Sequence, residues 1–197
     1  MVYRARSVTT QSDLELLQAW RAGDLTAGDA LVSRHWPSIA RFFRSKIGDD
    51  GVDLISQTFL ACVEHKDDIA NVKAFLFAVA RRRLADHLRK RHRTPELDLA
   101  LSSLADLGPG PATELTLHQR GALLRDGLSR IPLDDQIALE LAYFEQMATA
   151  DIAAVLEINE NTVRSRLSRA RDKLREVLAT LASADEAALA DSELGER

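Results

Sequence analysis

The chain is poor in the residues that build covalent or metal-bound frameworks. Its 197 residues include one cysteine, Cys62, which excludes an intrachain disulfide and any zinc site built from several cysteines. We interpret Cys62 as a small buried apolar residue. No uninterrupted apolar run approaches the roughly 18 residues of a membrane span, and no apolar signal core follows the first charges. We therefore expect a cytoplasmic protein with no membrane contact of its own.

The patterns that most enzymes need are also missing. The five histidines form no HxxxH or HxxE arrangement, and there is neither a glycine-rich phosphate loop nor a Gly-x-Ser-x-Gly elbow. The sequence therefore lacks the residue patterns that metal-assisted hydrolysis, nucleotide hydrolysis and acyl transfer require. We predict that the protein is not an enzyme, with no catalytic residue, no metal ligand and no cofactor.

Alternating β-branched runs are nearly absent, whereas apolar residues recur at three-to-four spacing almost everywhere. This pattern predicts an all-α protein of two small helical domains, spanning 1–94 and 113–182. A flexible linker rich in glycine and proline joins them at 95–112, and an acidic tail at 183–197 is expected to fray. The helices are expected at 12–46 with a break near 23–24, and at 53–65, 72–92, 113–130, 133–145, 149–156 and 160–182.

The net charge of -4 hides blocks of opposite sign. Residues 1–94 carry 16 basic and 11 acidic groups, 95–163 carry 3 and 12, 164–175 carry 6 and 1, and 176–197 carry 1 and 6. The basic groups gather at 81–93 and 164–175. Two separated basic clusters in an acidic chain suggest two contacts with one polyanion, although two solvated helix faces would give the same pattern.

The segments TADIAAVL at 149–156 and ENTVRSRLSRAR at 160–171 predict a helix, a short turn and a second helix. Asn159 is a suitable N-cap for the second helix. On a helical wheel an apolar stripe from Val163 faces the domain, and small polar residues occupy the opposite crest between flanking cations. A helix entering the major groove needs this division between base edges and phosphates. The expected DNA contacts are Asn161, Arg164, Ser165, Arg166, Ser168, Arg169 and Arg171.

These segments, together with LSRIPL at 128–133 and AYFE at 142–145, resemble region 4 of bacterial sigma factors, above all the extracytoplasmic-function (ECF) group. The N-terminal half is similar to sigma region 2. DLISQTFL at 53–60 resembles its signature for docking on core RNA polymerase, and NVKAFLFAVAR at 71–81 with DHLR at 86–89 resembles its promoter-melting helix. The resemblance implies a core-polymerase surface of Asp53, Leu54, Gln57 and Phe59. It also implies downstream-element and melting residues Lys73, Arg81, Arg82, Asp86 and Arg89.

What the resemblance implies is a transcription initiation factor that joins core RNA polymerase, directs it to promoter DNA and assists strand opening. It also implies an anti-sigma factor as a further partner. The chain departs from the family pattern at two informative places. Arg82 stands where the family usually has an amide, so the recognised downstream bases cannot be transferred. Glu157 stands where the family has glycine and must adopt a turn conformation that glycine manages more easily.

One alternative from another class is a helix-turn-helix regulator that binds DNA as a dimer without polymerase. Such a regulator would carry a ligand-binding or dimerising domain in its N-terminal half. This chain carries there a second basic helix, with Phe75 and Phe77 close before its arginines. That feature favours the sigma-factor interpretation.

Overall fold

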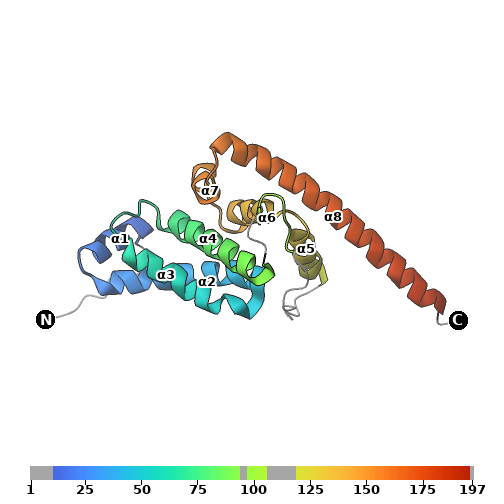
Figure 1. Ribbon diagram of the computed structural model, residues 1–197, viewed down its shortest axis with the longest axis horizontal. Helices are drawn as coiled ribbons and strands as arrows, with labels where there is room; N and C mark the ends of the chain where they lie inside the picture. The colour runs from blue at the N-terminus through green and yellow to red at the C-terminus, as the bar shows by residue number, and fades with distance from the viewer. Residues whose placement is uncertain (1–10, 94–96, 106–118, 196–197) are drawn as a thin grey trace. The chain divides into compact units, whose positions relative to one another are not determined.

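The computed structural model describes residues 11–93, 97–105 and 119–195, without the side chains of 119–122 and 184–195. The described residues form helices and one isolated bridge between Ser103 and Pro132, which confirms the expected all-helical fold. They divide into two compact units, Met1–Leu88 and Arg89–Arg197 (Figure 1). None of the described helices combines the length and apolar character that crossing a bilayer requires.

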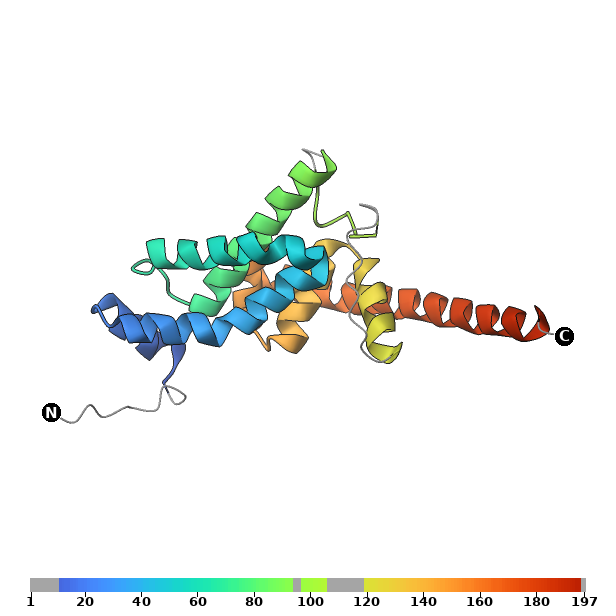
Figure 2. The ribbon, with the colours of Figure 1, turned by 90° about the horizontal axis from the view of Figure 1, so that it is seen from below.

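The first unit contains the helices α1 to α3 and α4 as far as Leu88 (Figures 1 and 2). Its elements are α1 (Asp13–Arg21), α2 (Leu25–Ile47), the 3-10 turn η2 (Gly48–Gly51), α3 (Val52–Glu64) and α4 (Val72–His92). The predicted break near 23–24 separates α1 from α2, where Gly23 adopts a φ of 101° and Asp24 caps α2 by accepting from the amides of Thr26 and Ala27. Local capping chemistry therefore sets this boundary.

Aromatic rings dominate the core of the first unit. Phe42 of α2 packs edge-on against Phe43 at 5.4 Å and against Phe77 of α4 at 5.7 Å between ring centroids. Leu76, Ala80 and Leu84 continue the buried side of α4. Because these positions recur every three or four residues, one side of α4 is committed to the core and its other side is left for solvent or partners.

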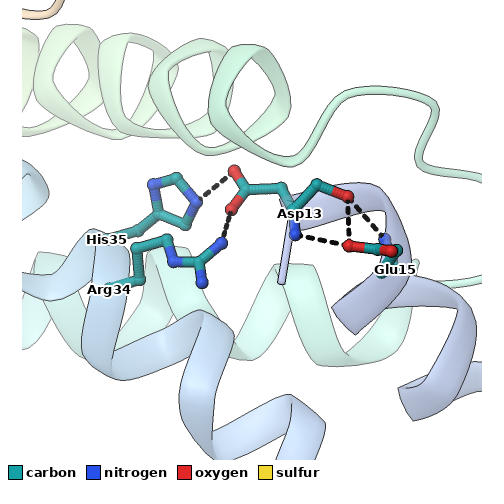
Figure 3. Close-up of polar contacts among 5 residues, drawn as sticks. Asp13, Glu15, Arg34 and His35 are labelled. Atoms are coloured by element: carbon teal, nitrogen blue, oxygen red, sulfur yellow. Dashed lines mark hydrogen bonds and ion pairs between the residues drawn. The ribbon is translucent and has the colours of Figure 1, made fainter. Parts of the chain in front are cut away.

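A polar contact fixes α1 to α2 (Figure 3). Nε2 of His35, whose side chain is 8% exposed, donates to Oδ2 of Asp13 at 2.6 Å, and Nη1 of Arg34 donates to Oδ1 at 2.7 Å. The His35 hydrogen bond and the Arg34 contacts outweigh desolvation and lower the pKa of Asp13 from 3.8 to about 2. The carboxylate therefore stabilises the packing of the two helices in its ionised form.

Replacing Asp13 by Asn should lower the free energy of unfolding at pH 7 by about 1–2 kcal/mol, allowing for the partial exposure of the pair. Because the folded-state pKa lies below the unfolded value, the contribution is complete above pH 3.8 and is lost as the pH falls toward about 2. Urea unfolding of the wild type and Asp13→Asn between pH 2 and 7 measures it. Asp29→Asn, an exposed change on α2, is the control. A difference that persists at pH 2 contradicts this explanation.

The second unit contains α5 (Gln119–Ser129), α6 (Leu133–Leu139), the π-helical turn η3 (Glu140–Phe144), α7 (Thr149–Leu156) and α8 (Glu160–Gly195). The helix expected at 133–145 is α-helical only to Leu139 and then widens into the π turn. The helix expected at 160–182 ends later than predicted, because α8 continues to Gly195; that the tail from 183 frays stays a prediction. Alanine and glutamate, which are strong helix formers, explain the extension.

The core of the second unit joins α8 to the helices before it. Leu128, Ile131, Leu139 and Ala170 are buried together, with Leu124, Leu167, Leu174 and Val177 packed around them. At Gly127 of α5, a Cβ would lie 2.8 Å from a methyl carbon of Leu178, so the two helices approach closely there. The first half of α8 is therefore held along one side, and its opposite side faces outward.

Part of the expected linker is packed against the second unit. The backbone amides of Leu133 and Asp134 donate to the carbonyls of Ser102 and Leu99, and the amide of Ala105 donates to that of Ser129. Residues 97–105 therefore extend the second unit. Residues 94–96 and 106–118, which hold the remainder of the linker, lie outside the described residues. The sequence-derived domain boundaries stay predictions.

Candidate nucleic-acid interface

The helix-turn-helix predicted at 149–167 forms as α7, a tight turn and the start of α8. Oδ1 of Asn159 accepts from the amide of Thr162 at 2.8 Å and from its hydroxyl at 2.9 Å. The expected N-cap role of Asn159 is thereby confirmed. Ile152, Val155 and Val163 are buried where the two helices meet, so their relative angle is fixed by packing.

Glu157 ends α7 in the left-handed conformation, with φ 58° and ψ 40°. The amides of Glu157 and Ile158 both donate to the carbonyl of Ala153, which closes the helix end. This geometry confirms that a glutamate here adopts a backbone conformation that glycine adopts at lower cost.

Replacing Glu157 by Gly should therefore raise the free energy of unfolding of the second unit by about 0.5–1 kcal/mol. Thermal unfolding of the full chain measures the change. Ala154→Gly is the matched control, because Ala154 is exposed on the same helix with ordinary helical geometry, and there glycine should destabilise by a similar amount. A lower melting temperature for Glu157→Gly would contradict the strain argument.

The outer face of α8 carries most of the residues predicted to contact DNA. Exposed side chains on this face are Asn161, Arg164, Ser165, Ser168, Arg169 and Arg171. They interact mainly with near neighbours on the same helix: Nη1 of Arg164 donates to Oδ1 of Asn161 at 2.8 Å, and Nε of Arg169 donates to the carbonyl of Ser165. Exposed contacts of this kind are weak, so the guanidinium groups stay available to a polyanion.

Arg166 differs from the other residues of the predicted set. Its side chain is 15% exposed, against 61% for Arg164, and it lies beside the buried carboxylates of Asp134 and Asp135. On the helical wheel Arg166 is about 60° from Val163 and about 40° from Ala170, both fully buried. The sequence placed Arg166 beside the apolar stripe as a cation expected to contact DNA, whereas the structure turns its side chain inward, next to Asp134 and Asp135 of α6.

Tyr143 lies in the AYFE segment of the region 4 resemblance, but the sequence assigned it no contact role. It is 56% exposed, and its hydroxyl accepts from Nη1 of Arg171 at 3.4 Å. Phe144 beside it is 57% exposed. The sequence signal for this exposed pair was the AYFE segment itself, close before the helix-turn-helix.

The second basic cluster lies on α4. Arg82, Asp86 and Arg89 fall within about 60° of one line along the helix, on the side away from the core. Phe75 shares this side, with its ring 6.3 Å from that of His65. Lys73 and Arg81 are partly exposed but lie about 180° and 100° from Arg82, so the structure does not bring all five predicted melting residues to one face.

The predicted polymerase-docking residues on α3 are partly exposed and partly buried. Asp53 and Gln57 are exposed, Leu54 is partly buried and Phe59 is 6% exposed, stacked on Trp36 of α2 at 5.4 Å. Phe59 is therefore a supporting core residue and not a surface contact. Leu60, which the sequence reading missed, is 55% exposed on the same side as Asp53 and Gln57. We call Asp53, Gln57, Leu60 and Glu64 the α3 outer face.

A helical chain with a capped helix-turn-helix and a basic outer helix face belongs to the DNA-binding helix-turn-helix class. The family model for sigma-70 region 4 matches residues 122–174. This match covers most of α5, all of α6 and α7, and the first part of α8, where the outer face lies.

Relatives over most of the chain narrow the class further. The ECF sigma factor EcfG of Rhodopseudomonas palustris is 30% identical over 72% of this chain and 80% of its own length. The ECF sigma factor SigM of Mycobacterium tuberculosis is 28% identical over 87% of both chains. The sigma factor RpoE of Bartonella quintana, solved with the anti-sigma factor NepR, superposes with a TM-score of 0.57 at 25% identity, covering 75% of this chain and 94% of that one.

The chain belongs to the ECF sigma factors of bacterial RNA polymerase. It is a non-enzymatic subunit that binds core polymerase and directs it to promoter DNA. The sequence prediction of family and function is confirmed.

Proposed function

We propose that the two basic helix faces bind two separate elements of one promoter. The outer face of α8 enters the major groove of the upstream element, with Arg164 and Ser165 next to base edges and Arg169 and Arg171 next to phosphates. This division follows from side-chain chemistry, since a guanidinium reads guanine or binds a phosphate according to its position. The observation that carries the proposal is the outer face itself, basic and exposed on a helix whose other side is buried.

The α4 face of Arg82, Asp86 and Arg89 holds the downstream element and the strand that separates as the duplex opens. Arginines bind the backbone of a single strand, and an aromatic ring such as Phe75 offers a surface on which an unstacked base can lie. Arg81 contributes positive charge beside this face, whereas Lys73 lies on the opposite side of α4 and contributes only to the charge of the whole helix. The carboxylate of Asp86 reduces the net positive charge of this face and can accept hydrogen bonds from amino groups on bases.

The α3 outer face docks on core polymerase. Its polar groups, Asp53, Gln57 and Glu64, surround the exposed side chain of Leu60, a mixture suited to a helical partner. Leu54 lies at the edge of this face, and Phe59 supports it from beneath. Core polymerase acts in the cytoplasm, so we place this protein there as well.

An anti-sigma factor is the remaining proposed partner. The Bartonella quintana relative was solved in complex with the anti-sigma factor NepR. By that likeness we propose that a protein of the same kind binds this chain and keeps it from polymerase. Co-purification of the tagged chain from its own organism, followed by mass spectrometry, identifies that partner.

Run-off transcription tests the proposal as a whole. Core polymerase with the wild-type protein should start at a defined set of promoters, found by mapping start sites across the genome, and core polymerase alone should not. Arg164→Ala with Arg169→Ala should remove most of this activity while core binding stays intact. Wild-type activity in the double variant would reject the α8 assignment.

A further inference from the structure

Arg166 lies within a cluster of four charges that joins α8 to α6. Its Nη1 is 3.3 Å from Oδ2 of Asp134 and 3.9 Å from Oδ1 of Asp135. Nζ of Lys173, two turns further along α8, donates to Oδ2 of Asp135 at 2.8 Å. We call these four residues the α6–α8 charge cluster. Two anions from one helix and two cations from the other give it no net charge.

Three members of the cluster, Arg166, Asp134 and Asp135, are largely withdrawn from water, and Lys173 is about half exposed. Asp134 and Asp135 are each 5% exposed, and Nε and Nη1 of Arg166 are buried without a hydrogen bond. Ion pairing is therefore what offsets the burial of the guanidinium. Both aspartates lie in the first turn of α6, where the helix dipole favours negative charge. Removing one partner of a buried pair leaves an uncompensated charge, so these groups depend strongly on one another.

The apolar contacts of α8 decide which side of the helix is buried, with Val163 and Ala170 fully buried and Leu167, Leu174 and Val177 packed around the core. Apolar contact has no preferred direction, so ion pairs between named atoms add a directional restraint to this packing. Rotating a helix by about 10° moves side-chain atoms 5–6 Å from its axis by about 1 Å. A binding site tolerates only about 0.5 Å or 10–20° of error before its contacts weaken. Charges that must meet across the interface restrict this rotation.

We propose that Arg166 is a positioning residue, which with Lys173 holds α8 against Asp134 and Asp135 in the rotation that points Arg164, Ser165 and Arg169 at DNA. Arg166 itself does not contact the promoter. The inference rests on the proposed function, since it assumes that the outer face of α8 reads the upstream element. It adds a specificity-determining role for two carboxylates on a helix that does not touch DNA.

The test uses holoenzyme assembled with saturating sigma protein on a promoter duplex, with affinity measured over a range of salt. Arg166→Met, which keeps the length of the side chain, should weaken binding to the cognate promoter five- to tenfold and leave the salt dependence unchanged. Arg169→Ala, as the phosphate-contact control, should lower the slope of log affinity against log salt by about 0.9. Arg166→Lys should restore at least half of the loss in log affinity, because a lysine can still pair with the aspartates.

The carboxylates provide the decisive comparison. Asp134→Asn with Asp135→Asn should weaken binding to the same extent, and adding Arg166→Met to that pair should cause little further loss. Lys173→Met is a milder variant, because the Lys173 side chain is 47% exposed, and it should weaken binding two- to threefold. It keeps the proposal testable if Arg166→Met fails to fold.

Three results would overturn the proposal. A fall of about 0.9 in the salt slope for Arg166→Met would make Arg166 a phosphate contact. If Arg166→Met folds and binds the promoter with full affinity, Arg166 contributes only to the stability of the fold. If the loss of promoter affinity in the triple variant equals the sum of the losses in Arg166→Met and in the Asp134→Asn, Asp135→Asn pair, Arg166 acts independently of the aspartates. A different outcome concerns the proposed function: if wild-type holoenzyme does not use the upstream element, that function fails and the positioning claim needs another readout. The melting temperatures of the same variants supply it, because additive shifts in melting temperature would show that the four charges do not act as a unit.

Discussion

Replacing Arg164 by Ala should reduce discrimination among upstream promoter sequences by about 1–3 kcal/mol, roughly 5- to 150-fold, at the base pair that it reads. The Arg164 side chain is 61% exposed, and its partners Asn161 and Glu160 are exposed neighbours on the same helix. The guanidinium can therefore exchange those partners for a base edge at little cost. Affinity of the holoenzyme for a panel of promoters, each changed at one upstream position, measures the effect.

Arg169→Ala is the comparison for this prediction. As a phosphate contact, Arg169 should contribute to all promoters alike, so its loss weakens binding uniformly and lowers the salt dependence. The two arginines are five residues apart and differ in angle by about 140° on α8. If Arg164→Ala weakened every promoter equally and also lowered the salt slope, Arg164 would be a phosphate contact and the reading of α8 would need revision.

Replacing Leu60 by Glu should weaken the binding of core polymerase about tenfold or more, because a charge would enter the apolar centre of the docking surface. Leu60 is 55% exposed, so the folded protein should tolerate the change. Competition for core polymerase against the labelled wild-type protein measures the affinity directly. Promoter use should fall in proportion.

Leu25→Glu is the matched control for Leu60→Glu. Leu25 is 74% exposed at the start of α2 and is not part of the α3 outer face, and the substitution is chemically the same. It should leave core binding within about twofold, since isolated surface changes have small effects. Equal core affinities for Leu60→Glu and wild type would remove the α3 outer face from the docking surface.

Local chemistry made most of the fold readable from the sequence. The helices at 72–92 and 149–156 begin and end where apolar spacing and breaker residues predicted. Asn159 caps α8 because its side-chain oxygen accepts from an unpaired backbone amide in the first turn of the helix. This interaction does not depend on the rest of the fold. Glu157 adopts the left-handed conformation that ends α7, only three residues before α8 begins. Interactions of this kind depend on residues within one or two turns.

The roles of individual side chains depended on contacts between distant residues. Arg166 has the same spacing pattern as a phosphate-binding arginine, and only the approach of α6 shows that Asp134 and Asp135 bind it instead. Phe59 lies in the docking signature, yet Trp36 of another helix covers it. Residues 97–105 were predicted to be linker because they lack a helical pattern. Their hydrogen bonds go to residues 129–134, some thirty positions away, and the local sequence does not indicate such distant partners.

By itself, the sequence determined the all-helical fold, the helix-turn-helix, the two basic clusters and the sigma-factor family. The tertiary structure alone decided which of the cations point outward and which are bound within the protein. The physical reason is that helix periodicity defines the faces of one helix, whereas the burial and pairing of a charge depend on which other helix packs against that face.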